Sequence, residues 1–135
     1  RDAGEERRRV RRDLEHAALG RALSEHTGVL ALGGGAVVRP DNRDELARYA
    51  ARGGHVVFLD TDVDSAIGRV GHDRGRPLLA GDARQRWSAL MDARRPLYLE
   101  VATVRVRTSG RTMGQVVAEV DRRVRARGGE PSDVG

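Results

Sequence analysis

The stretch HVVFLD, residues 55–60, decides the fold of this chain of 135 residues. Its four consecutive apolar residues indicate a strand that is buried on both faces, as in a parallel sheet covered by helices. Helices are expected before it, at residues 40–52, and after it, from Asp62 or Asp64 to Gly71. This alternation predicts βα units and therefore an α/β fold.

The rest of the sequence extends the same pattern. We expect helices at residues 12–26, 84–94 and 113–126, strands at 29–32 and 101–106, a loop at 72–83 and a flexible tail at 128–135. Parallel strands joined by helices give a three-layer fold with helices on both faces of the sheet. Ligands bind such sheets at the carboxyl ends of the strands.

The amino-acid composition limits the classes of function that this chain can have. Hydrophobic residues make up 39% and aromatic residues 3%, so we expect an aliphatic core in one small domain. The chain has no cysteine for a thiolate metal site and no apolar run long enough to cross a bilayer, so we expect a cytoplasmic protein. All 25 basic residues are arginine, and the formal net charge is +5. A GC-rich genome would explain the missing lysines, but arginine also suits carboxylate and phosphate ligands.

Two features of the sequence could bind a carboxylate or phosphate ligand. The stretch LALGGGAVV, residues 30–38, places three glycines after an expected strand, where a bare backbone allows close approach. Arg94 shares a helix face with Trp87, Leu90 and Met91, and a charge on an apolar face needs an ionic partner. A ligand carboxylate or phosphate would provide one; alternatively, Arg94 reaches solvent at the domain edge.

Other charged segments admit two interpretations. Arg74 and Arg76 flank a glycine in the loop at 72–83, which suits either a lid over an anionic ligand or a solvated loop, and the same holds for Arg69. Residues 5–12 are similar to a basic arm for nucleic acid, but acidic residues interrupt them and no aromatic residue is present for stacking. A solvated helix start is favoured. The histidines lack metal-ligand spacing, and no serine lies in a nucleophile elbow.

Three motifs in series resemble the shikimate kinase family: GVLALGGGAVV (residues 28–38), RGRPLLAG (74–81) and ARRPLYLEVA (93–102). Members of this family are small P-loop kinases that phosphorylate the 3-hydroxyl of shikimate with Mg-ATP, on the route to chorismate and the aromatic amino acids. The resemblance covers most of the chain. It implies that the backbone of the triple glycine lies against the shikimate ring and that Arg94 binds the shikimate carboxylate; these glycines are Gly33, Gly34 and Gly35.

The same resemblance implies roles for further arginines. Arg76 would reach the transferring phosphate as a catalytic lid residue, and Arg69 and Arg111 would enclose the adenine of ATP. A second substrate arginine is expected in a Gly-Glu-x-x-Phe-Arg-x-x-Glu pattern near the start of the chain. The glycine triplet selects Arg12 for this role, with Arg9 as the alternative, and in either case arginine stands where the family has phenylalanine.

The chain departs from the family in one respect, because it contains no Gly-x-x-x-x-Gly-Lys-Ser/Thr loop to cradle the phosphates of ATP. Members of the family also have an Asp-x-Asp segment, whose aspartates help to hold the metal and bind the substrate hydroxyls. Asp60 and Asp62 have the same spacing, but they follow a different strand and do not take this role. We therefore expect residues 1–127 to form a partial P-loop NTPase-like domain, incomplete at the N-terminus and with a lid at about 72–83. We expect the ligands of Mg²⁺ in a preceding segment, and the chain alone to be inactive.

The expected partners are shikimate and ATP, bound by a monomer; no membrane and no nucleic acid are expected. Two alternatives stay open. One is a P-loop kinase that acts on another small hydroxylated metabolite, such as a sugar acid. The other is a degenerate, non-catalytic module that binds anions or nucleic acid.

Overall fold

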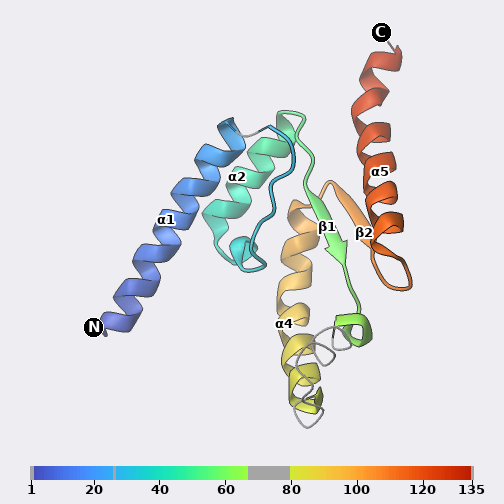
Figure 1. The fold of residues 1–135 in the computed structure, drawn as a ribbon. Coiled ribbons are helices and arrows are strands. Elements are labelled where there is room, and N and C mark those ends of the chain that lie inside the picture. The colour runs from blue at the N-terminus through green and yellow to red at the C-terminus, as the bar shows by residue number, and fades with distance from the viewer. Residues whose placement is uncertain (1, 26, 67–79, 135) are drawn as a thin grey trace. The chain divides into compact units, whose positions relative to one another are not determined.

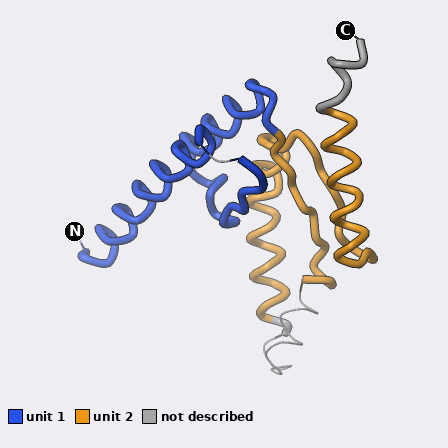
Figure 2. Tube along the Cα trace, turned by 45° about the horizontal axis from the view of Figure 1, so that its top comes forward, with its two compact units in different colours: residues 1–54 blue, residues 55–135 orange. Residues whose placement is uncertain are grey.

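A computed structural model describes residues 2–25, 27–66 and 80–134 of the chain. The elements, labelled in Figure 1, are α1 (Ala3–Glu25), the short 3₁₀ helix η1 (Ala36–Val38), α2 (Pro40–Ala51), β1 (Val57–Asp60), α4 (Ala80–Val101), β2 (Val104–Arg107) and α5 (Met113–Val134). They form two compact units, residues 1–54 and residues 55–135 (Figure 2). None of the described helices is both long and apolar enough to cross a membrane.

The C-terminal unit, residues 55–135, is built on a parallel strand pair. β1 and β2 pair in the register Val57 with Val104 and Asp60 with Arg107, which confirms the predicted α/β class with parallel strands. α4 and α5 lie on opposite sides of this pair (Figure 1, Figure 2). On the α4 side, Phe58 of β1 stacks on Tyr98 with 4.9 Å between ring centroids. The core of this unit therefore forms where helices cover the strands.

The helix α4 is longer than predicted. We expected it to end at Arg94, before Pro96, but it continues through this proline to Val101, and β2 begins only at Val104. An interior proline removes one backbone hydrogen bond and costs about 3 kcal/mol. The contact between Tyr98 and Phe58 and the burial of Val101 lie beyond the proline, and they stabilise the last turns of the helix.

The helix α5 begins with a reciprocal cap. The Thr112 backbone N–H donates to Gln115 Oε1 at 2.8 Å, and the Gln115 N–H donates to Thr112 Oγ1 at 3.1 Å, which is a capping box. The helix packs against β2 and extends to Val134, past its predicted end at residue 126. The predicted flexibility of residues 128–135 concerns motion and stays a prediction, as does the single domain at 1–127.

The N-terminal unit, residues 1–54, consists of α1, η1 and α2. α1 begins at Ala3 instead of the predicted residue 12, because ion pairs between neighbouring turns and acidic residues in the first turn support its charged N-terminal half. α2 begins with Pro40 in the first turn and ends in a Schellman motif, with Gly53 at a φ of +96°. Leu19 of α1 and Leu46 of α2 are buried in this unit.

The strand predicted at residues 29–32 is wrong. These residues are extended chain without a strand assignment, and Val29 is 93% exposed. A strand needs a neighbour for its backbone hydrogen bonds. Within the described residues the sheet contains only β1 and β2, and the N-terminal unit contains no strand that could pair with the apolar run before the glycines.

Candidate functional site

The three glycines form a turn that leads into η1; we call Gly33, Gly34 and Gly35 the glycine turn. Ala36 donates its backbone N–H to the Gly33 carbonyl and Val38 donates to the Gly35 carbonyl, each at 3.1 Å. None of the three glycines has a positive φ, and a Cβ on Gly33 would meet no atom within 4 Å. Neither backbone conformation nor the packing of this unit therefore explains a glycine at position 33.

Two side chains from α2 bind backbone carbonyls of η1, which follows the glycine turn directly. Asn42 donates its Nδ2 to the Ala36 carbonyl at 2.9 Å, and Arg43 donates Nη1 to the Val37 carbonyl at 2.7 Å. Val37 itself is 5% exposed. We did not identify Asn42 or Arg43 as site residues from the sequence, where the only signal was a polar pair that begins two residues after a helix-starting proline.

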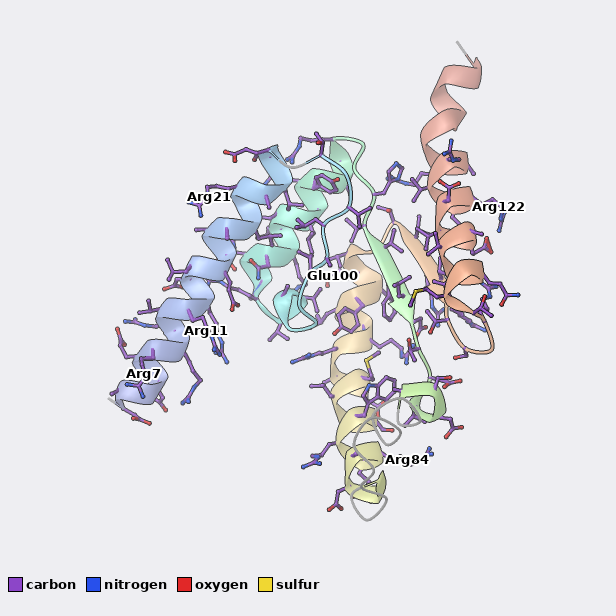
Figure 3. All side chains as sticks on the ribbon, in the orientation of Figure 1. Arg7, Arg11, Arg21, Arg84, Glu100 and Arg122 are labelled. Atoms are coloured by element: carbon purple, nitrogen blue, oxygen red, sulfur yellow. The ribbon has the colours of Figure 1, made fainter. Side chains whose placement is uncertain are left out.

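Arg12, the predicted substrate arginine, lies exposed on α1 and has no hydrogen bond or ion pair with any described residue. Arg9, the alternative, pairs with Glu6, and Glu15 faces Arg11 at 3.9 Å instead of Arg12. Figure 3 shows Arg7, Arg11 and Arg21 projecting from the same helix. Of the two candidates, Arg12 thus has a guanidinium that is available to a ligand.

Arg94 lies half-buried on α4 and, among the described residues, has neither a hydrogen-bond acceptor nor an acidic partner. A charged residue that is partly removed from water and has no partner is unfavourable to the extent that its lost hydration is not replaced. Every other half-buried arginine in the described chain has a partner: Arg39 with Asp13 and Asp41, Arg43 with the Val37 carbonyl, Arg95 and Arg105 with Asp60, and Arg127 with His55. The ionic partner that the sequence requires for Arg94 is therefore not supplied by the described residues.

Asp60, at the carboxyl end of β1, is bound by two arginines that sequence analysis did not connect with it. Arg95 of α4 donates to Oδ1, and Arg105 of β2 donates Nε to Oδ2 at 2.8 Å. Burial raises the pKa of Asp60, but the hydrogen bonds from Arg105 and Arg95 outweigh it and hold this pKa below the ordinary value of 3.8. Asp60 is 6% exposed, so this cluster is a structural tie between α4 and the strands.

Replacing Asp60 tests this tie. Asp60→Asn should lower the free energy of unfolding of the C-terminal unit by about 2 kcal/mol, less than for a fully buried pair because both guanidinium groups are partly exposed. The single tryptophan, Trp87, reports unfolding of this unit through its fluorescence during urea titration. The matched control is Asp64→Asn, which removes an exposed pair with Arg84 and should change stability by less than about 1 kcal/mol.

The lowered pKa of Asp60 determines whether its contribution to the free energy of unfolding rises or falls with pH. The folded protein binds fewer protons at this group than the unfolded chain, so its contribution is complete above about pH 4 and is lost as the pH falls further. The acid-dependent loss of stability should therefore be smaller in Asp60→Asn. Equal stability of wild type and variant, near neutral pH and in acid, would contradict the assigned tie.

The carboxyl ends of β1 and β2 meet at a polar surface. Thr61 and Thr108 share a hydrogen bond between their hydroxyls at 2.7 Å. Asp62 accepts the Ser65 backbone N–H at 2.7 Å, so the helical residues 63–66 begin after Asp62 and not after Asp64. This backbone hydrogen bond is the main cause of the lowered pKa of Asp62.

Arg111, the predicted adenine-binding arginine, follows β2 in the loop before α5, at the predicted place in the chain. Its Nη1 lies 3.9 Å from Glu119 Oε1, and Arg122 also pairs with Glu119. Arg111 is exposed and shares its acidic neighbour, so its guanidinium faces can be reached by a ligand.

Two predicted site residues, Arg69 and Arg76, lie outside the described residues, as does most of the expected lid at 72–83. In the described part of the chain, no group of three or more histidine, aspartate or glutamate side chains could hold a metal ion. The glycine turn and Arg12 belong to the N-terminal unit, and Arg94 and Arg111 belong to the C-terminal unit.

The family model described as shikimate kinase matches residues 4–125. The curated shikimate kinase of Streptomyces coelicolor is 50% identical over 105 residues, which are 78% of this chain and 58% of that protein. Those of Frankia casuarinae and Mycobacterium tuberculosis are 49% and 43% identical over 85% and 88% of the chain, and the chain covers 48% and 63% of their lengths. It thus spans less than two thirds of each relative.

Proposed function

Because this chain belongs to the shikimate kinase family, we propose that it serves the ATP-dependent phosphorylation of the 3-hydroxyl of shikimate. The family has a P-loop fold, and the α/β chain with its parallel strand pair agrees with the P-loop NTPase-like class predicted from the sequence. In this reaction the hydroxyl oxygen forms a bond to the γ-phosphorus, the bond from that phosphorus to ADP breaks, and the hydroxyl proton leaves.

The observation that carries the proposal is Arg94, a half-buried residue whose guanidinium has no ionic partner among the described residues. The shikimate carboxylate would supply the missing charge through two parallel N–H···O bonds, the geometry that arginine favours with carboxylates. Arg12, exposed and without a described partner, would supply a second positive charge to the same ligand.

The glycine turn would form the surface on which the shikimate ring rests. Gly33 has an ordinary φ and open space where its Cβ would be, so it is a glycine for a reason outside the described packing. A ring held against the backbone would occupy that space and exclude a side chain. The carbonyls of Ala36 and Val37, directly after the turn, accept hydrogen bonds from Asn42 and Arg43, which supports the backbone on this side of the surface.

A single methyl group tests this surface. Gly33→Ala should leave the fold intact and weaken shikimate binding about tenfold, because the methyl occupies the place of the ring. Isothermal titration calorimetry with shikimate measures the affinity, and circular dichroism checks the helices. The matched control is Gly20→Ala in α1, where a Cβ also meets nothing within 4 Å and where shikimate affinity should not change. An unchanged affinity in Gly33→Ala would remove the glycine turn from the site.

For the nucleotide, we propose that Arg111 and Arg69 enclose adenine and that Arg76 contacts the transferring phosphate. The exposed guanidinium of Arg111 beside the start of α5 supports its part of this assignment. The described residues contain no group of three or more histidine, aspartate or glutamate side chains that could hold a metal ion, so we assign no Mg²⁺ ligand among them; Mg²⁺ would be bound together with ATP. We further infer a monomer that acts in the cytoplasm.

The experiment that tests the proposal is a coupled assay of ADP release with the full-length natural protein that contains this sequence. Shikimate should be phosphorylated in preference to other small hydroxylated acids, such as quinate and gluconate. Turnover of gluconate without turnover of shikimate would instead support a kinase for sugar acids. If none of these acids is phosphorylated, neither a shikimate kinase nor a kinase for sugar acids is supported.

A further inference from the structure

Asn42 connects the glycine turn to α1. It is 7% exposed, and both ends of its amide are used: Nδ2 donates to the Ala36 carbonyl at 2.9 Å, and Oδ1 lies 2.6 Å from Nδ1 of His16. Because a carbonyl can only accept, the Asn42 nitrogen must face Ala36, and its oxygen must face His16. His16 Nδ1 is then the donor of this bond. One buried side chain thus fixes the residue after the glycine turn to a side chain of α1.

A second set of contacts ties the same parts of α1 and α2 together. His16 Nε2 lies 3.5 Å from Asp41 Oδ2, and Arg39 bridges Asp41 at 2.6 Å and Asp13 at 2.8 Å. The hydrogen bond from Arg39 lowers the pKa of Asp41. α1 and α2 pack side by side in this unit (Figure 1). The contacts on α1 are therefore made by Asp13 and His16.

These two α1 residues follow Arg12 directly in the helix. Asp13 is its neighbour in the chain, and His16 lies one helical turn further on, on the same face of α1 as Arg12. A helix is stiff over one turn, so holding Asp13 and His16 also holds the backbone from which the Arg12 side chain extends. Asn42 does the same for the glycine turn through Ala36.

We propose that Asn42 and His16 are positioning residues, which hold Arg12 and the glycine turn in one fixed arrangement for binding shikimate. The inference rests on the proposed function, in which Arg12 and the glycine turn contact this substrate. Asn42 and His16 act through the residues that they hold. Their part is to keep the guanidinium and the bare backbone at the spacing of one small carboxylated ring, because a displacement of about 1 Å in a binding site can lower its efficiency by orders of magnitude.

The test compares substitutions at both ends of the Asn42–His16 hydrogen bond in the full-length natural protein. Asn42→Asp keeps the shape but replaces the donor to Ala36 with a second acceptor, and should raise the KM for shikimate about tenfold with the KM for ATP unchanged. His16→Leu should have a similar effect. His16→Asn, whose Nδ2 can take the place of the histidine Nδ1, should restore the wild-type KM. Asp44→Asn, an exposed charge change on α2, is the matched control and should leave both KM values unchanged.

The KM values of the variants distinguish a positioning role from a merely structural one. A shikimate KM that is unchanged in folded Asn42→Asp and in His16→Leu overturns the inference, and so does a rise of both KM values together, which would indicate a merely structural role. If Asn42→Asp fails to fold, His16→Leu and His16→Asn decide the question alone, because the His16 side chain is 26% exposed. Wild-type protein without any shikimate turnover would overturn the proposed function first, and this inference with it.

Discussion

Arg94→Ala is expected to weaken shikimate binding by roughly a hundredfold, the loss of a charge-assisted, two-bond contact with a carboxylate. The affinity for ATP should stay the same, since the proposed contact is with the shikimate carboxylate alone. Because Arg94 has no hydrogen bond or ion pair with the described residues, its removal breaks no polar contact among them. The free energy of unfolding should therefore hold or rise. Calorimetric titration with shikimate and with ATP, together with urea unfolding, separates these effects.

Arg86→Ala is the control for this substitution, because Arg86 lies exposed on the same helix, α4, and likewise has no described partner. Its removal changes the net charge equally and should leave shikimate binding unchanged. Arg95→Ala would not serve, because Arg95 binds Asp60 and its loss would disturb the helix. If Arg94→Ala binds shikimate as tightly as Arg86→Ala does, Arg94 is an arginine that reaches solvent, and the carboxylate has another partner.

Arg76→Ala is expected to lower kcat for shikimate phosphorylation by about a thousandfold, while both KM values change little. An arginine on the transferring phosphate stabilises charge that develops on its equatorial oxygens in the transition state, and it contributes much less to binding of the ground state. Steady-state kinetics of the full-length natural protein measures this. Arg74→Ala, two residues away in the same segment, is the matched control and should retain most of the activity. A rise in the KM for ATP at constant kcat would instead make Arg76 a binding residue.

The fold could be predicted where local pattern decides it. The apolar run before Asp60 indicates β1, and the sequence also predicts the polar turn that starts α2. What lies beyond local pattern was missed: α4 continues through Pro96 because Tyr98 packs on a strand 40 positions earlier in the chain. The run at 29–32 has the composition of a strand, but strand formation depends on a neighbour that no local pattern reveals.

The candidate site likewise contains residues that could be predicted from the sequence and residues that could not. Three adjacent glycines and an arginine on an apolar face are unusual in themselves, so residue type and spacing were enough to single them out. The partners of Asp60 lie 35 and 45 residues away, and the bond from His16 to Asn42 spans 26. Contacts at such separations depend on how strands pair and how helices pack, so local sequence pattern does not reveal them.

The ion pair between Arg95 and Asp60 also affects Arg94, which is the neighbour of Arg95 in the chain. Arg94 has no described partner that would hold it, yet its backbone is one peptide bond from a residue anchored to β1. The base of the Arg94 side chain is thereby preorganised, and ligand binding would have to order only the rotamers beyond it, which costs on the order of 1 kcal/mol instead of the larger cost of ordering a free segment. An internal ion pair in this way lowers the entropic cost of binding at its neighbour.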